Sequence, residues 1–302
     1  MSIRLLYAGV DTLEATFEGE LVDGLISRLQ TAKDRAQLLD RPQPFDGGGE
    51  EFFVTPKGSG TYRFVLQDSD IILRVSVAAS GIPPVSVRLL AQALATHGHT
   101  ELYERSAQLA ASLGADRENT LSRLDLCLDV QGFEFTDRDF ENIVCRASAR
   151  SIHKDGEGVT YKLGTRNTVF RIYRKDAELK AKKKLSYATV WESAEHYDPD
   201  APVWRIEVQY RRDALRELSA DTVRESFQIL PGLFAHGVEW CKLCVPSGAN
   251  KSRWPLDPRW EVLPGLWGAS EPQPRIRHAA RAESEGRIIS RLYGALASLG
   301  AS

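Results

Sequence analysis

The amino-acid sequence predicts an α+β fold built on an antiparallel β-sheet, and three observations point to it. First, β-rich runs separated by turns with Gly, Asp or Pro recur along the chain, and in two places three such runs follow one another. Second, several of these runs alternate apolar and polar residues, which is typical of antiparallel strands with one face in the core. Third, strands and helices follow a similar order in the first and second parts of the chain, which indicates two related halves.

The N-terminal part is expected to hold two short strands, a helix, a loop rich in Pro, Gly and acidic residues, three more strands and a long helix. Apolar residues at helical spacing, including Leu21, Leu25 and Leu29, support the first helix. The expected ranges are, in the same order, 3–9, 12–17, about 20–39, 41–51, 51–56, 61–67, 70–77 and 86–113.

The C-terminal part is expected to begin with a strand and then a helix that has Thr136 as its N-cap. Three strands, a basic helix, one more strand and a further helix follow. The ranges are 121–133, 136–149, 150–154, 158–164, 168–175, 176–184, 203–212 and about 219–236. No sequence repeat links the two parts, so the relation between the halves rests on element order alone.

These elements divide the chain into three regions. Residues 1–114 are expected to form an N-terminal α+β half for recognition or scaffolding, 115–239 a second half that carries the chemistry, and 240–302 an arm with a C-terminal helix at about 278–299. Four of the six tryptophans lie in 240–267, among Pro and Gly. Either they stack on single-stranded bases or they pin an irregular arm to the core, and the second interpretation is favoured.

Composition places the chain among ordinary globular proteins. No apolar run is long enough to span a bilayer, the N-terminus has no signal-peptide pattern, and four cysteines are too few for a disulfide framework, so a reducing cytoplasmic setting is expected. The Cys241–Cys244 pair has the spacing of two zinc ligands, but no second pair follows, and buried free cysteines are expected instead.

Net charge gives no sign of a nucleic-acid partner, because it is −2 for the whole chain. Its distribution is more informative: residues 171–184 carry seven basic and two acidic side chains. Such a segment either binds a phosphate backbone or forms the solvated face of a helix, and charge alone favours the second.

Three predicted strands carry ionisable side chains on one face and apolar side chains on the other. Because side chains alternate with period two, the polar faces hold Arg123, Asp125, Cys127 and Asp129; Arg171, Tyr173 and Lys175; and Arg205, Glu207 and Gln209. If the strands belong to one sheet, these groups converge on a single surface. The alternative is a solvated outer face with cross-strand ion pairs. Asp is rare inside strands, so Asp125 and Asp129 need a reason, and a hard cation such as Mg²⁺ or Mn²⁺ supplies one.

Three motifs resemble the replication initiation factor family, the Rep_trans group of rolling-circle plasmid and phage initiators with the related relaxases of conjugative elements. RLDLCLD is similar to the family's R-x-D-x-x-x-D strand, YKLGTRNTVFRIYRKDAE to its tyrosine-Gly and I-x-x-Y-x-K stretch, and WRIEVQYRR to its R-x-E-x-x-x-R element. The motifs span about 120–212. Arg174 departs from the acidic or Asn residue that is common there, and the Trp-rich tail has no counterpart.

The resemblance implies a DNA-nicking enzyme in which Tyr173 attacks a phosphodiester and leaves a 5′-phosphotyrosine and a free 3′-hydroxyl. It also implies that Asp125, Glu207 and Asp129 hold Mg²⁺ or Mn²⁺, with Asp129 the weakest of the three assignments. Alternation along the strand also places Arg171 and Lys175 on the same face as Tyr173, where they would stabilise the negative charge that develops during attack. Arg123 and Arg205 are expected to pair with Asp125 and Glu207 instead.

DNA contacts are expected from Arg166 in the GTRN turn and from Arg174, Lys182, Lys183 and Lys184 in the basic segment. The partners that the resemblance implies are origin DNA, a helicase and a second copy of the chain, with no membrane. Two alternatives remain open: an origin-binding protein of the same fold that does not cleave, and a structural or regulatory protein that has kept only the fold.

Overall fold

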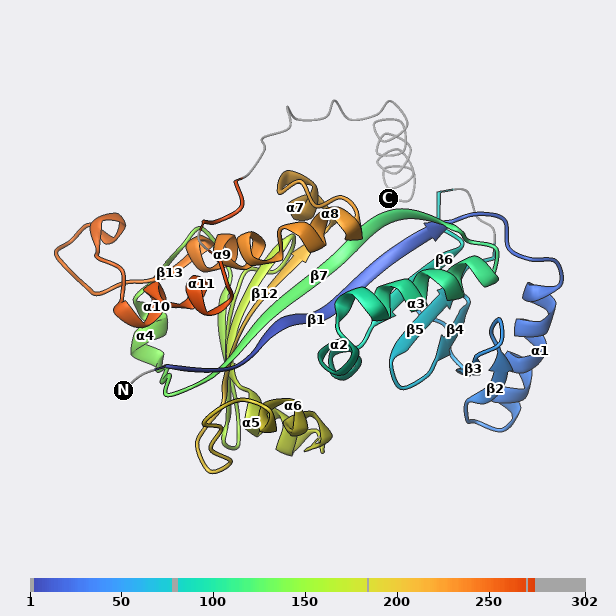
Figure 1. Cartoon of the computed structure of the whole chain (residues 1–302), viewed down its shortest axis with the longest axis horizontal. Helices are drawn as coiled ribbons and strands as arrows, with labels where there is room; N and C mark the ends of the chain where they lie inside the picture. Colours follow the sequence, from blue (N-terminus) through green and yellow to red (C-terminus); the bar gives the residue numbers. More distant parts are fainter. Residues whose placement is uncertain (1–2, 78–80, 184, 270, 275–302) are drawn as a thin grey trace, which may run out of the picture.

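The computed structural model describes residues 3–77, 81–183, 185–269 and 271–274. Its centre is one antiparallel sheet of 11 strands flanked by helices (Figure 1), so the predicted α+β class is confirmed. In sheet order the strands are β2 (Gln43–Asp46), β3 (Glu51–Val54), β4 (Phe64–Gln67), β5 (Ile71–Val75), β6 (Val85–Leu89), β1 (Arg4–Glu18), β7 (Arg117–Gln131), β12 (Trp204–Arg211), β11 (Thr168–Arg174), β10 (Gly158–Leu163) and β9 (Arg150–Asp155). Among these described residues, no helix is long and apolar enough to cross a membrane.

The two longest strands, β1 and β7, lie side by side at the middle of the sheet. Each has 15 residues, and they pair with each other along their whole length. The sequence predicts two short strands where β1 is one continuous strand. Where the sequence predicts a break between two strands, β1 instead has a register shift in its pairing with β7, between Val10 and Thr12.

The strand order repeats on the two sides of this central pair. In the N-terminal half, β1 pairs with β6, and β5, β4 and β3 follow outward; in the C-terminal half, β7 pairs with β12, and β11, β10 and β9 follow outward. In each half the long first strand therefore pairs with the last strand of its own half. This order agrees with two related halves, while the three domain boundaries stay a prediction.

The helices gather on the two faces of the sheet. They are α1 (Leu25–Leu38), α2 (Ala91–His97), α3 (His99–Ser112), α4 (Asp137–Glu141), α5 (Lys175–Ala181), α6 (Thr189–Glu192), α7 (Arg212–Glu217), α8 (Val223–Gln228), α9 (Leu230–Trp240), α10 (Pro258–Glu261) and α11 (Leu263–Leu266), with 3₁₀ turns η1 (Leu185–Ala188) and η2 (Lys251–Arg253). Figure 1 shows α5 and α6 on the side of the sheet opposite α7, α8 and α9.

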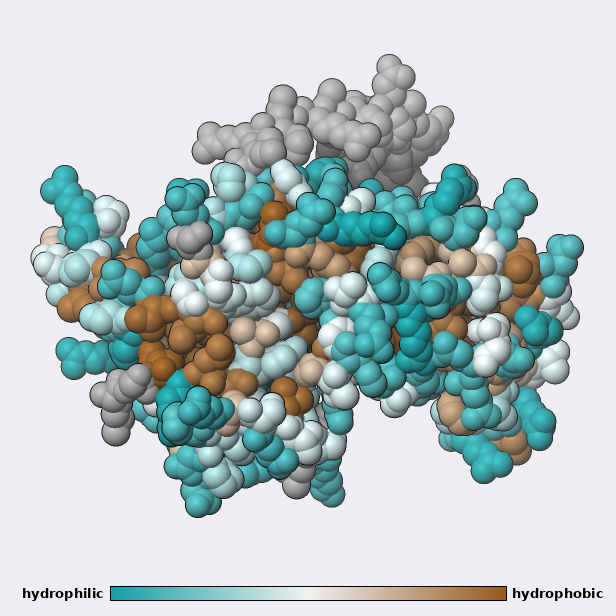
Figure 2. All heavy atoms as spheres, viewed as in Figure 1, coloured by the Kyte–Doolittle hydropathy of each residue, from teal (hydrophilic) through white to brown (hydrophobic). Residues whose placement is uncertain are grey.

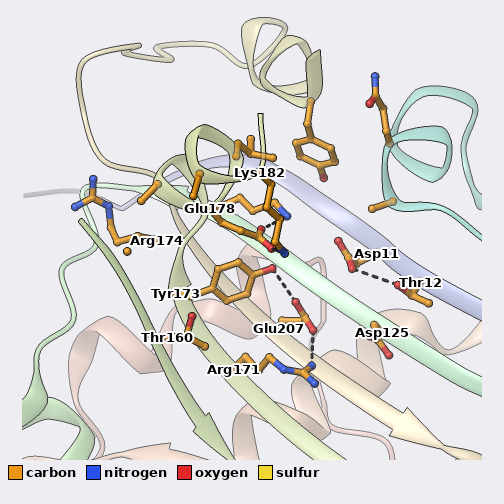
Figure 3. A pocket seen from close by; sticks show the side chains of 18 of the residues that line it. Asp11, Thr12, Asp125, Thr160, Arg171, Tyr173, Arg174, Glu178, Lys182 and Glu207 are labelled. Atoms are coloured by element: carbon orange, nitrogen blue, oxygen red, sulfur yellow. Dashed lines mark hydrogen bonds and ion pairs between the residues drawn. The ribbon is translucent and has the colours of Figure 1, made fainter. Parts of the chain in front are cut away.

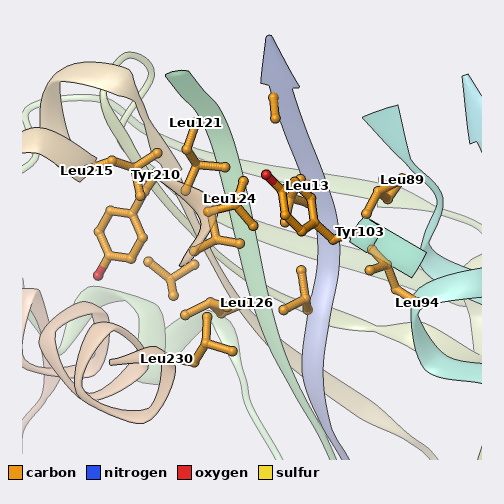
Figure 4. Close-up of a cluster of buried hydrophobic side chains, with 14 of the residues drawn as sticks. Leu13, Leu89, Leu94, Tyr103, Leu121, Leu124, Leu126, Tyr210, Leu215 and Leu230 are labelled. Atoms are coloured by element: carbon orange, nitrogen blue, oxygen red, sulfur yellow. The ribbon is translucent and has the colours of Figure 1, made fainter. Parts of the chain in front are cut away.

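One hydrophobic core extends under both halves of the sheet. Leu13 and Leu124 are cross-strand partners of β1 and β7, and both are fully buried. Figure 4 shows Tyr103 of α3 near Leu13, and Leu230 of α9 near Leu126. Both halves therefore bury their apolar faces in the same cluster, to which β1 contributes from Val10 onward.

The predicted long helix at 86–113 is wrong in its first part. Residues 85–89 form β6, in which Val85, Val87 and Leu89 alternate with polar residues and are fully buried. The rest divides into α2 and α3 at Gly98, whose φ of 81° a helix cannot include. Pairing with β1 on one side and β5 on the other therefore determines the structure of this segment.

Other predicted boundaries also change. The loop expected at 41–51 contains β2, which forms a hairpin with β3. The helix expected at 136–149 is the short α4, capped by Thr136 as predicted, and a strand β8 (Ile143–Cys145) follows it. The helix expected at 219–236 consists of α8 and α9, which meet at Ile229 ahead of Pro231. The helix expected at 278–299 lies outside the described residues.

The Trp-rich arm packs onto the core, as expected. Trp260 is buried, and its indole N–H donates to the carbonyl of Val238 at 3.0 Å. Trp267 stacks on Phe234, and its N–H donates to the carbonyl of Cys127 in β7 at 2.9 Å. Figure 2 shows apolar side chains gathered on the surface around α10 and α11, whereas the surface over α3 is mostly hydrophilic.

All four cysteines are free thiols, as predicted. The close pair, however, is not Cys241 with Cys244. Strand β13 (Cys241–Leu243) pairs with β8, and this places the sulfur of Cys241 2.8 Å from that of Cys145. The sequence spacing of Cys241 and Cys244 therefore does not predict which two sulfur atoms are in contact.

The close packing of α9 on the sheet predicts the effect of a small substitution. A Cβ atom at Gly237 would lie 2.7 Å from Cγ2 of Val208 in β12, so Gly237→Ala should lower the free energy of unfolding by about 1–3 kcal/mol. Gly265→Ala in α11 is the control, because a Cβ there meets no atom within 4 Å. Urea denaturation of both variants checks this, and equal changes in stability would contradict it.

Candidate active site

The register of three neighbouring strands brings the predicted polar residues onto one face. Tyr173 of β11 stands opposite Arg205 of β12, and Arg205 stands opposite Asp129 of β7. In the next row Arg171 stands opposite Glu207, and in the row beyond it Gln209 stands opposite Asp125. The convergence that the sequence suggests for three separate strands is therefore present in the sheet.

A third carboxylate joins Asp125 and Glu207, and sequence reasoning missed it. Asp11 is the extra residue of the β-bulge between Val10 and Thr12, where β1 uses one residue more than β7. One carboxylate oxygen from each of Asp11, Asp125 and Glu207 lies within 4.8 Å of the others. We call these residues the acidic triad. The sequence does carry a sign of the bulge. Val10 and Leu13 are both buried but lie three residues apart, whereas regular alternation places buried residues two or four apart.

The acidic triad is suited to a hard divalent cation. Asp125 and Glu207 are buried, and Asp11 is partly exposed. Burial raises the pKa of Asp125 to about 7, and the nearby Glu207 adds to the rise, while the Arg123 guanidinium opposes it. Crowded carboxylates repel one another unless positive charge comes between them, and Mg²⁺ and Mn²⁺ take such oxygen ligands. The donor set therefore fits the cation that the sequence predicts.

Tyr173 is hydrogen-bonded to the acidic triad (Figure 3). Its hydroxyl donates to Oε2 of Glu207 at 2.9 Å, while Oε1 of Glu207 accepts from Arg171 at 2.6 Å. The side chain is only 7% exposed, and burial together with Glu207 raises the pKa of Tyr173 well above its usual value. Lys175 lies over the ring, with Nζ 5.6 Å from its centroid, and forms an ion pair with Glu178. Both expected cations thus flank Tyr173.

Asp129 lies outside the acidic triad, although it shares a strand face with Asp125. Its Oδ1 accepts from Nε of Arg205 at 2.6 Å, and its Oδ2 accepts from Nη2 of Arg205 at 2.7 Å and from Trp191 at 2.9 Å. Both partners of this ion pair are completely buried. The oxygens expected to bind metal are therefore occupied by a guanidinium and an indole.

The expected arginine pairings are half right. Arg123 pairs with Asp125, as predicted. Arg205 does not pair with Glu207; it holds Asp129, contacts Asp11 and donates to the hydroxyl of Tyr187 at 2.6 Å. Arg205 thus links the buried ion pair to the acidic triad.

A cavity of about 810 Å³ lies above this face. The acidic triad and Tyr173 form part of its lining together with α5, η1 and the β9–β10 hairpin. Residues of the N-terminal half line it as well, namely Thr12, Ser69, Arg88, Leu90, Ala91 and Gln92. The two halves of the sheet therefore contribute to one site.

The residues expected to contact DNA lie at different distances from this cavity. Arg174 and Lys182 line it, although each also forms an ion pair, with Asp176 and Glu178 respectively. Lys183 is exposed just after α5. Arg166 is exposed in the β10–β11 turn, at the end of β11 opposite Tyr173, and it does not line the cavity. Lys184 is outside the described residues.

Comparisons with known proteins support the fold. No family model matches the sequence, and no curated protein matches it. The structure is similar to that of the rolling circle replication initiator protein from Geobacillus stearothermophilus, with a TM-score of 0.56 and 15% sequence identity, over 90% of this chain and 100% of that one. At this identity the similarity establishes a shared fold and leaves the chemistry to the residues of the site.

The buried ion pair predicts a large cost for one conservative change. Asp129→Asn removes one of the two carboxylates that contact the fully buried Arg205, the other being Asp11, so the free energy of unfolding should fall by about 3 kcal/mol. Asp155→Asn, at an exposed position of the cavity rim, should change it by less than about 0.5 kcal/mol. Guanidinium chloride unfolding measures both. A similar stability for the two variants would mean that Arg205 does not depend on Asp129.

The acidic triad predicts which carboxylates bind metal. Asp11→Asn should weaken Mn²⁺ affinity at least about tenfold, because one of three converging ligands loses its charge. The rim variant Asp155→Asn should bind Mn²⁺ like the parent protein. Isothermal titration calorimetry gives both constants, and undiminished Mn²⁺ affinity in Asp11→Asn would remove Asp11 from the site.

Proposed function

We propose that the protein nicks and rejoins one DNA strand at an origin, with Tyr173 as the nucleophile, and so starts rolling-circle replication or transfer. The observation that carries this proposal is the hydrogen bond from the Tyr173 hydroxyl to Glu207, a member of the acidic triad. A nucleophile and a set of metal-binding carboxylates are thereby in direct contact. Similarity of fold to a rolling circle replication initiator supports the same function.

The reaction assigns a role to each residue. The phenolic oxygen of Tyr173 forms a bond to the phosphorus of a phosphodiester, and the bond from phosphorus to the 3′-oxygen breaks, which leaves a 3′-hydroxyl and a 5′-phosphotyrosine. Because burial raises the pKa of Tyr173, attack requires a proton acceptor, and Oε2 of Glu207 is within reach at 2.9 Å. Arg171 holds the other oxygen of Glu207 in place. Rejoining is the same exchange in reverse.

The metal would be Mg²⁺ or Mn²⁺, held by Asp11, Asp125 and Glu207. When bound, it would neutralise charge that develops on the phosphate. Lys175 and Arg171 contribute positive charge beside the phenol. Asp129 has no part in this assignment, because its carboxylate is not among the three whose oxygens converge.

DNA is the partner that this function requires. A helicase, a second copy of the chain, a plasmid or phage replicon and a cytoplasmic location stay predictions of the family resemblance. Of the residues first expected to contact DNA, Arg174 and Lys182 have positions at the cavity that fit the role.

One observation favours the second candidate, an origin-binding protein that does not cleave. Tyr173 is almost completely buried, and the cations around it already have carboxylate partners. A site that only binds DNA could retain such a closed arrangement. The two candidates differ in whether a covalent product forms.

The test is incubation with single-stranded oligonucleotides from the protein's own replicon and Mn²⁺, followed by denaturing electrophoresis. A covalent protein–DNA band should form only with the metal and should be absent from Tyr173→Phe. Tyr161→Phe is the matched control, because Tyr161 lies on the neighbouring strand and its hydroxyl donates to Asp137, away from the acidic triad.

The outcomes separate the candidates. A band that persists in Tyr173→Phe would assign the nucleophile to another residue. Binding of the oligonucleotide without a covalent product from the parent protein would establish the non-cleaving alternative and refute the enzymatic proposal.

A further inference from the structure

Three arginines surround one carboxylate where the N-terminal half meets the active-site face. Nη1 of Arg74, Nε of Arg88 and Nη1 of Arg123 lie 3.4, 3.7 and 3.5 Å from the carboxylate oxygens of Glu14. Arg123 also pairs with Asp125, a member of the acidic triad. Glu14 is left to balance Arg74 and Arg88, so positive charge is in excess beside the acidic triad.

Arg88 is the arginine of this group with the weakest contacts. Its Nε is buried and has no hydrogen-bond partner in the described part of the chain, because 3.7 Å from Glu14 is too long for a hydrogen bond. Its side chain is 34% exposed, against 15% for Arg74. Arg88 lines the cavity that contains Tyr173, and Arg74 does not. The Arg88 guanidinium makes no hydrogen bond to the described residues, and a third of its side chain is exposed at the cavity, so it can donate to a ligand there.

The sheet sets the separation between Arg88 and the acidic triad. Arg88 is on β6, Asp11 on β1 and Asp125 on β7, which are successive neighbours in the sheet. With strands about 4.8 Å apart, the backbones of Arg88 and Asp125 are about 10 Å from each other across the sheet. A phosphate group held at the acidic triad is too small to occupy both places. A DNA strand, with its successive phosphates, is long enough to contact both the acidic triad and Arg88.

We propose that Arg88 binds a DNA phosphate next to the scissile one, so that the bound strand crosses the sheet from the C-terminal to the N-terminal half. This inference rests on the proposed function, because it names where the same DNA strand continues. The planar guanidinium donates two parallel hydrogen bonds to a phosphate, which Glu14 does not accept from Arg88 in this arrangement. Ser69 and Gln92, also from the N-terminal half, line the same cavity and would add polar groups for the bound strand.

The experiment measures binding without cleavage. Fluorescein-labelled (dT)20 is titrated by fluorescence anisotropy, over a series of KCl concentrations, into the Tyr173→Phe protein and into the same protein with Arg88→Ala, Arg88→Lys or Arg74→Ala. Arg74→Ala is the matched control, since it also removes an arginine from Glu14 but one outside the cavity. Thermal melting confirms that each variant is folded.

Loss of one phosphate contact has a defined signature. Arg88→Ala should weaken binding about tenfold and reduce the slope of log K against log salt by about 0.7, the value for one contact with a single strand. Arg88→Lys should keep the slope, and Arg74→Ala should change affinity less than about twofold.

Equal affinity and slope for Arg88→Ala and the parent would overturn the inference, and so would equal losses for Arg88→Ala and Arg74→Ala. Failure of the proposed function is recognised separately, because it is the absence of a covalent product in the nicking assay and does not affect binding of (dT)20. A parent protein that does not bind (dT)20 would also overturn the inference about Arg88, while the nicking assay alone decides the proposed function.

Discussion

The pairing of β1 with β7 is the interaction on which the rest of the structure depends. It joins the two halves into one sheet, and it is also where the acidic triad is assembled, since Asp11 and Asp125 belong to the two partners. The bulge places Asp11 and Thr12 in succession between Val10 and Leu13, which both belong to the core, and both Asp11 and Thr12 line the cavity.

Alternation of residues along strands predicted much of the site and failed where strands depart from regularity. Asp125, Tyr173 and Glu207 were placed on one face because β11, β12 and β7 pair with one another without register shifts. Asp11 was missed because a bulge changes the phase of alternation, and only the spacing of Val10 and Leu13 indicates it.

Asp129 shows a different limit of sequence reasoning. Alternation assigns a side chain to a face, and it does not say which neighbour that side chain will meet. The partner of Asp129 is Arg205, distant in sequence but directly opposite in the register.

The segment 85–89 shows a third limit. Its five residues are too few to distinguish a strand from the start of the helix that follows, and pairing with β1 and β5 decides the matter.

Arg205 gives the acidic triad a property that its carboxylates alone would lack. By contacting Asp11 while held by Asp129 and Tyr187, it supplies positive charge at the edge of the triad from within the fold itself. If the acidic triad binds a cation as proposed, its ligands are kept together in advance and an arriving ion would need little rearrangement. The sheet would then not require the ion in order to fold, in contrast to small domains whose folding does.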